Sequence, residues 1–176
     1  MDQATAALLG AVVGIVGTTT AAGLAAWQGR WATRTQIDAT NSQWRRQMQR
    51  DAYSALIQQA MSISRLFDEI DYKICNGQYA DSHTDPMADA AAQGLHDLSA
   101  ATFAAILEGP SDLADVAGPI EDAHREWWIK LRTFGDMVAE GQDGDEERAA
   151  MITAQEASGV ALGRFMGRAQ AYLNHG

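Results

Sequence analysis

Apolar side chains recur every three or four residues along four stretches of the chain after residue 50. This spacing places them on one face of a helix, so each stretch predicts an amphipathic helix with one buried stripe. Turns that contain Gly or Pro separate the stretches. The expected helices run from Tyr53 to near Gly77, over 86–108, over 111–140, and from Asp143 or Asp145 to Tyr172.

The stripes define an expected core. Its members are Tyr53, Leu56, Ile57, Ala60, Ile63, Phe67, Ile70 and Ile74 in the first helix, Leu95, Leu98, Thr102 and Ile106 in the second, Leu113, Val116, Ile120, Ala123, Trp127, Leu131, Phe134 and Val138 in the third, and Met151, Ala154, Ser158, Leu162, Phe165, Ala169 and Tyr172 in the fourth. Pro119 should kink the third helix or split off a short first piece. No period-two run of β-branched residues predicts a strand. The pattern therefore predicts an all-α protein with an up-down four-helix bundle.

The N-terminal segment has a different pattern, because no ionisable side chain occurs from Ala4 to Gly29. As a helix, Thr5 to Trp27 would span roughly 34 Å at about 1.5 Å per residue. This length crosses a hydrocarbon core of about 30 Å, so we predict a single transmembrane helix. Two alternatives remain open: a cleaved signal peptide, and a buried helix of a soluble protein.

Aromatic and basic residues follow this expected span. Trp27 and Trp31 suit the headgroup region, and Arg30 and Arg34 stand beside them. The excess of arginine after the span predicts that the N-terminus lies outside the cell membrane and the remainder in the cytoplasm. We expect contacts with anionic lipid headgroups from a further basic cluster of Arg45, Arg46 and Arg50.

Small residues recur along the span at alternating steps of three and four. Such a row lets two helices approach closely in a membrane, so it predicts a homo-oligomer. The alternative is that an Ala- and Gly-rich composition produces the row without any interface. The row consists of Ala7, Gly10, Gly14, Gly17 and Ala21.

The formal net charge of −10 is distributed unevenly along the chain, with −1 in residues 1–29, +4 in residues 30–50 and −13 in residues 51–176. We therefore expect a transmembrane helix, a basic helical stalk and an acidic cytoplasmic bundle. The acidic bundle would repel phosphates, which argues against direct contact with nucleic acid. The single cysteine excludes a disulfide framework and a Cys-based zinc site.

One pair of residues resembles part of a metal site. Glu121 and His124 form an E-x-x-H pair on one helix face, but a di-iron bundle needs a second such pair and two more carboxylates. We therefore expect no metal or other cofactor, and we interpret Glu121 and His124 as a hydrogen-bonded surface pair. The acidic segments 81–85 and 143–147 lack the spacing of a calcium loop, so we interpret them as turn and helix-cap residues.

No motif for catalysis is present. The chain has no G-x-S-x-G elbow and no Gly-rich phosphate loop, and Cys75 at a helix end is expected to serve packing. We therefore predict that the protein is not an enzyme. In the pair Trp127–Trp128, the first fits the core stripe, which leaves Trp128 facing outward or sideways as a candidate contact for a partner protein.

The layout resembles a known group of proteins. Besides the uncharged span and acidic body, the strings QWRRQMQRDAY at 43–53 and LEGP at 107–110 are similar to small actinobacterial single-span membrane proteins. Most of that group has no assigned activity, and some members are labelled KilB-like plasmid spread proteins. The resemblance implies a membrane-anchored accessory or scaffold role linked to DNA transfer, and no catalytic residue.

Together these patterns predict a non-enzymatic, self-associating scaffold whose cytoplasmic bundle recruits an unidentified protein. One rival is an oligomeric pore or holin-like channel, because Thr18 to Thr20 and the small-residue row would suit a channel lining. The other rival is a soluble helical bundle that binds a ligand or a metal.

Overall fold

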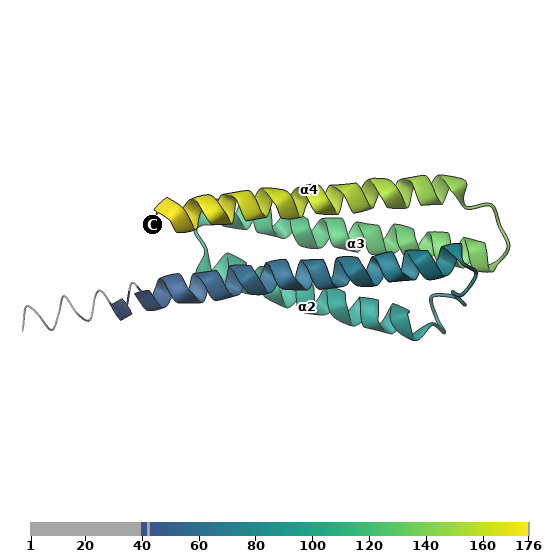
Figure 1. The fold of residues 1–176 in the computed structure, drawn as a ribbon, viewed down its shortest axis with the longest axis horizontal. Helices are drawn as coiled ribbons and strands as arrows, with labels where there is room; N and C mark the ends of the chain where they lie inside the picture. Colours follow the sequence, from purple (N-terminus) through teal and green to yellow (C-terminus); the bar gives the residue numbers. More distant parts are fainter. Residues whose placement is uncertain (1–39, 42, 176) are drawn as a thin grey trace, which may run out of the picture. The chain divides into compact units, whose positions relative to one another are not determined.

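The computed structural model describes residues 40, 41 and 43–175. Within these residues the chain is helical, with no strand. Residues 43–75, which we call the first helix, are followed by α2 (Pro86–Glu108), α3 (Ser111–Ala139) and α4 (Asp145–His175) (Figure 1). The predicted all-α class and four helical segments are confirmed for this part of the chain.

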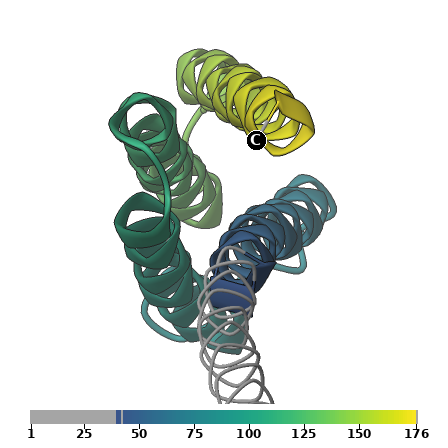
Figure 2. The same cartoon turned by 90° about the vertical axis from the view of Figure 1, so that its left-hand side faces the viewer.

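The four helices form a bundle within a compact unit, Arg46–Gly176, and run alternately up and down (Figure 1). The connections 76–85 and 140–144 lie at one end, which we call the distal end (Figure 1). The connection 109–110, residue 46 and the last turns of α4 lie at the other, the proximal end. Viewed from the proximal end, the helices surround a common core (Figure 2).

The helix boundaries follow from local side-chain chemistry. Asp85 caps α2, because its carboxylate accepts a hydrogen bond from the amide of Met87 at 2.9 Å, and Pro86 occupies the first turn. Gly77 lies two residues after the end of the first helix and Gly141 two residues after the end of α3, with φ angles of 65° and 73°. A side chain would be strained in this left-handed conformation, so glycine ends both helices at the distal end.

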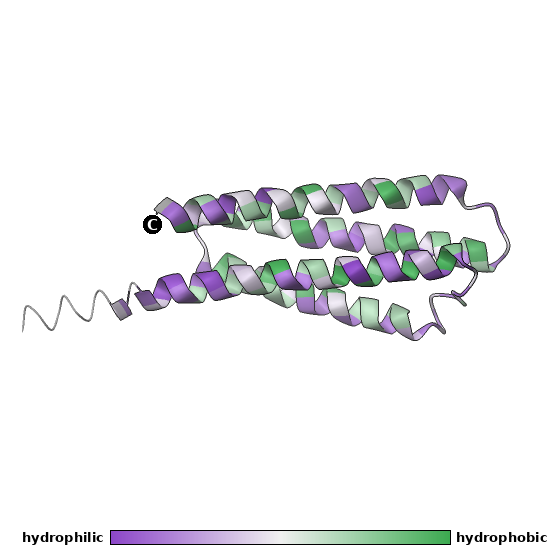
Figure 3. Ribbon diagram, in the orientation of Figure 1, coloured by the Kyte–Doolittle hydropathy of each residue, from purple (hydrophilic) through white to green (hydrophobic). Residues whose placement is uncertain are grey.

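Each helix buries one stripe and exposes a polar face (Figure 3). The prediction is confirmed for the first helix, where Ile57 alone among the expected members is only partly buried. It is wrong at Tyr172 of α4, which is 37% exposed, and Ala161 of the same helix is buried although it was not expected in the core. The expected members of the other three helices that are only partly buried are Leu95, Ile106, Val116, Ala123, Val138 and Leu162. In α2 the buried stripe is mostly small, and its members are Ala88, Ala91, Leu98, Thr102 and Ala105.

The expected division of α3 at Pro119 does not occur, since one helix runs from Ser111 to Ala139. Pro119 is exposed. The carbonyl of Asp115, which loses its amide partner at Pro119, therefore lies on the solvent-exposed side of the helix, where water is able to hydrogen-bond to it. Packing of the buried face, at Ala117 and Ile120, holds the helix through this position.

The expected transmembrane helix lies outside the described residues, as does the small-residue row from Ala7 to Ala21. The same holds for Trp27, Arg30, Trp31 and Arg34. Among the described helices, none combines the length and apolar character that crossing a membrane requires.

Candidate functional site

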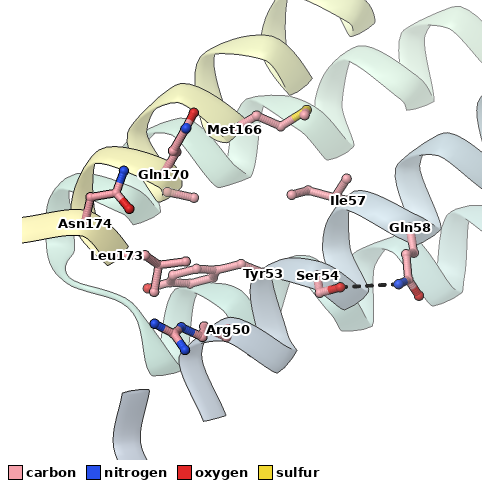
Figure 4. Close-up of a pocket in the computed structure, with 10 residues that line it drawn as sticks. Arg50, Tyr53, Ser54, Ile57, Gln58, Met166, Gln170, Leu173 and Asn174 are labelled. Carbon is pink, nitrogen blue, oxygen red and sulfur yellow. Dashed lines mark hydrogen bonds between the residues drawn. The ribbon is translucent and has the colours of Figure 1, made fainter. Parts of the chain in front are cut away.

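A groove lies between the first helix and α4 near the proximal end, with a volume of about 610 Å³ (Figure 4). Its apolar lining comes from the Tyr53 ring and from Ile57, Met166, Ala169 and Leu173. Its polar lining comes from Arg50, Ser54, Gln58, Gln170 and Asn174. The groove thus combines an apolar floor with amide, hydroxyl and guanidinium groups, as ligand sites commonly do.

Tyr53 contributes the most unusual group in this lining. Its side chain is 2% exposed and packs edge-on against Phe165, with the ring centroids 5.8 Å apart. The Tyr53 hydroxyl is buried and has no hydrogen-bond partner among the described residues. Burial, and secondarily Tyr172, Asp112 and Glu108, raises the pKa of Tyr53 to about 12. The hydroxyl therefore keeps its proton at neutral pH.

Polarity changes along the groove. Figure 4 shows Arg50, the hydroxyl of Tyr53 and Asn174 gathered at one end, while Met166 and Ile57 lie toward the other. Gln58 donates a hydrogen bond to Ser54 at 3.2 Å on the first-helix rim, so these two groups satisfy each other. Arg50 is the one charged residue of the described lining.

Acidic residues are distributed unevenly between the two halves of the bundle. The proximal half, residues 46–60, 98–125 and 160–176, contains 5 basic and 6 acidic residues. The distal half, residues 61–97 and 126–159, contains 5 basic and 15 acidic residues. Nearly all of the net negative charge of the bundle therefore lies away from the end at which residue 46 begins the unit.

His124 lies in the core, and the expected surface pair with Glu121 is wrong. The imidazole is fully buried, with Nδ1 2.8 Å from the Ile120 carbonyl and Nε2 3.1 Å from the Ser64 hydroxyl. Burial lowers the pKa of His124, although the carbonyls of Ile120 and Ala60 favour the charged form. Glu121 instead forms an ion pair with Arg125 on the surface.

These two residues therefore do not form half of a metal site. No cluster of three His, Cys, Asp or Glu side chains that could hold a metal ion occurs in the part of the chain that the structure describes.

Trp128 does not face outward. It is 9% exposed and stacks on Phe67, with centroids 5.5 Å apart and an interplanar angle of 19°. Trp127 contacts the same ring edge-on at 5.0 Å. Phe67 thus fixes both tryptophans in the core, and the basis for expecting Trp128 to contact a partner is removed.

The segment 81–85 acts as a turn and cap, as expected. The Asp81 carboxylate accepts hydrogen bonds from the amides of His83 and Thr84, both at 2.8 Å. Asp136 of α3 holds the same connection, because it accepts from the amide and the hydroxyl of Ser82 at 2.8 and 2.9 Å. At the other distal connection, the Asp143 carboxylate accepts a hydrogen bond at 3.2 Å from the amide of Asp145, the first residue of α4.

Cys75 is exposed, so the expectation that it packs is wrong. Its thiol lies 3.7 Å from an Asp71 carboxylate oxygen. Partial burial, and next the Asp71 charge, raises the pKa of the Cys75 thiol. The thiol is therefore accessible but a weak nucleophile at neutral pH.

The three arginines of the expected basic cluster, Arg45, Arg46 and Arg50, are all exposed, and the structure places Arg50 in the groove lining. The sequence assigned Tyr53 to the core but did not reveal the groove, which forms between helices more than 100 residues apart. The exposed Trp44, at 63%, is an additional aromatic residue next to these arginines in sequence.

Neither a protein-family model, nor a curated protein, nor a solved structure matches this sequence. The function is therefore inferred from the geometry and charge of the chain itself.

Proposed function

We propose that the protein is a non-enzymatic scaffold, anchored in the cell membrane by its uncharged N-terminal segment, whose helical bundle binds partners in the cytoplasm. The segment from Ala4 to Gly29 supports the anchor, and the arginines that follow it support this orientation. The row of small residues in the segment supports self-association.

The observation that carries the proposal is the charge sorting within the bundle. An anionic membrane surface repels carboxylates that lie within about 8 Å, the screening length at physiological salt. The first helix spans roughly 45 Å from residue 46 to residue 75 at about 1.5 Å per residue. A bundle tethered at its proximal end would therefore keep most of its 15 distal acidic residues beyond the repulsive range.

The anchor is tested by placing charges in the span of the full-length protein. Val12→Arg with Val16→Arg should release the protein into the soluble fraction, because each central arginine costs about 2.5–3.5 kcal/mol on insertion. Val12→Leu with Val16→Leu is the matched control and should stay in the pellet after alkaline extraction. Extraction of the unaltered protein into buffer would refute the anchor.

Self-association is tested separately by crosslinking within the membrane. Gly10→Leu with Gly14→Leu removes the close-approach surface and should abolish crosslinks between spans. Gly23→Leu, outside the row, should leave them unchanged. Unchanged crosslinking in the first variant would reject this interface while leaving the anchor intact.

The groove favours a second candidate, a soluble ligand-binding bundle, because its size and mixed lining are typical of a ligand site. This candidate requires the N-terminal segment to be buried within the protein. It predicts a monodisperse full-length protein that is purified without detergent, whereas the scaffold proposal predicts that detergent is required.

A further inference from the structure

A small polar site lies within the apolar core, between α3 and the first helix. The imidazole of His124 is fully buried there, with Nδ1 2.8 Å from the Ile120 carbonyl and Nε2 3.1 Å from the Ser64 hydroxyl. The Ser64 hydroxyl also lies 2.9 Å from the carbonyl of Ala60. The site therefore joins one imidazole, one hydroxyl and two carbonyl groups.

The Ile120 carbonyl fixes where the neutral imidazole carries its proton. A carbonyl oxygen only accepts hydrogen bonds, so Nδ1 must be the protonated nitrogen. Nε2 is then an acceptor, and the Ser64 hydroxyl lies within hydrogen-bond distance of it. In the neutral state, the Ser64 hydroxyl therefore donates to Nε2 and not to the Ala60 carbonyl.

The same atoms also accommodate a second proton on the imidazole. A protonated Nε2 becomes a donor, and the oxygen of Ser64 is able to accept from it. The hydroxyl hydrogen then turns to the Ala60 carbonyl. Both ring N–H groups and the hydroxyl have acceptors in this charged state, so protonation leaves no buried donor unpaired.

The main cost of this protonation is the burial of the charge. Burial lowers the pKa of His124, the carbonyls of Ile120 and Ala60 oppose that shift, and no charged side chain of the described residues contributes to it. Charged side chains in these turns of the four helices stand at partly or fully exposed positions, and they are Arg65, Asp68, Asp97, Glu121, Arg125 and Glu156. The hydrogen bonds of the site therefore decide whether the charge is tolerated.

We propose that His124 and Ser64 form a proton-responsive contact between α3 and the first helix, which takes up a proton from solvent while the bundle remains folded. The hydrogen bond between the two side chains reverses on protonation, because His124 replaces Ser64 as the donor. All of these groups lie within the compact unit Arg46–Gly176, so this proposal does not rest on the membrane anchor.

The test follows the ring nitrogens of His124 by NMR, in full-length protein labelled with nitrogen-15 histidine and held in detergent. Replacing His83, His96 and His175 by Gln in turn assigns the four histidines. At neutral pH, His124 should carry its proton on Nδ1. At lower pH, both nitrogens should become protonated while circular dichroism still shows full helix content. A proton on Nε2 at neutral pH, or loss of helix in the same step as protonation, would overturn the proposal.

Ser64→Ala tests the role of the hydroxyl. The charged ring loses the acceptor of its Nε2–H group, whereas the neutral ring loses only a donor to Nε2, so the charged form loses more. The variant should therefore bind the proton at His124 about tenfold more weakly in the folded state. Ser62→Ala, at an exposed position of the same helix, is the matched control and should leave proton binding unchanged. Equal proton binding in the two variants would overturn the role of Ser64.

Discussion

The two ends of the bundle are built differently. At the distal end, Asp136 fastens the first connection to α3, and Tyr79 of that connection packs into the core at 8% exposure. At the proximal end, the first helix and α4 are separated by a groove that Arg50 and the Tyr53 ring help to line. The distal end is thus closed by specific contacts and carries the acid charge, whereas the proximal end is open and nearly neutral. This difference predicts that contacts at the distal end contribute more to stability than contacts at the proximal end.

The largest expected change in stability comes from removing one core phenylalanine at each end. It is measured by urea unfolding of residues 46–176, a compact unit with its own core. Phe67→Ala should lower the free energy of unfolding by about 3–5 kcal/mol, because it removes a fully buried ring. Phe165→Ala should cost about 1 kcal/mol less, because Phe165 contacts one aromatic ring and Phe67 contacts two. The exposed Phe103→Ala is the control and should change stability by less than about 0.5 kcal/mol. A larger loss at Phe165 would reverse the comparison.

A smaller loss of stability should follow from adding a methyl group at Gly135, which packs against Tyr79. In Gly135→Ala the new Cβ would lie 2.7 Å from the Tyr79 ring and 2.9 Å from the Ile74 Cδ1 atom, so one of them must move. We expect a loss of about 1–3 kcal/mol in thermal or urea unfolding. Gly163→Ala meets no neighbouring atom and should instead gain about 0.5–1 kcal/mol from helix propensity. Equal effects of the two substitutions would show that the packing of Tyr79 is loose.

The two hydrogen bonds from Ser82 to Asp136 should contribute to the free energy of unfolding by the same amount as the packing at Gly135 or less. Asp136→Ala leaves the Ser82 amide and hydroxyl without their acceptor, and we expect a loss of about 1–2 kcal/mol. Hydrogen exchange should show faster exchange of the amides in 76–85, while the proximal connection is unaffected. The exposed Asp122→Ala is the matched control. Unchanged hydrogen exchange in 76–85 would mean that the hydrogen bonds between Asp136 and Ser82 do not hold this connection in place.

His124, which lies between the two ends, predicts a pH dependence. Burial lowers its pKa in the folded state below the ordinary value near 6.5, so the unfolded chain binds the proton more readily. Its contribution to stability is therefore full above about pH 6.5 and is lost as the pH falls through the lowered pKa. His124→Asn should flatten this part of the stability profile relative to the exposed His96→Asn control. Identical profiles would show that His124 is not charged on unfolding.

Much of the fold follows from local sequence signals. Pro86, Gly77 and the pair 109–110 predicted helix ends that the structure confirms to within a few residues. The register of α3 does not follow from the sequence alone, because Ala123 and His124 are adjacent and the pattern does not determine which of them faces the core. The Ser64 hydroxyl, 60 residues away, satisfies the imidazole and lets it be buried.

The candidate site was less predictable for the same reason. The groove depends on how far the first helix and α4 stand apart, which is set by packing across the whole core. The sequence also leaves Trp128 facing outward or sideways, whereas in the bundle it stacks on Phe67. Sequence periodicity identifies which residues of one helix share a face, and only the assembled bundle identifies what covers that face.

The orientation of the bundle relative to the cell membrane is tested most directly through Cys75, the only cysteine of the chain, which is exposed near the distal end. Cells that produce the full-length protein are treated with a membrane-impermeant maleimide before or after permeabilisation. The anchored, cytoplasmic bundle predicts that the protein remains in the alkali-washed membrane pellet and that Cys75 is labelled only after permeabilisation. Labelling in intact cells, or recovery of the protein in the soluble fraction, would contradict it.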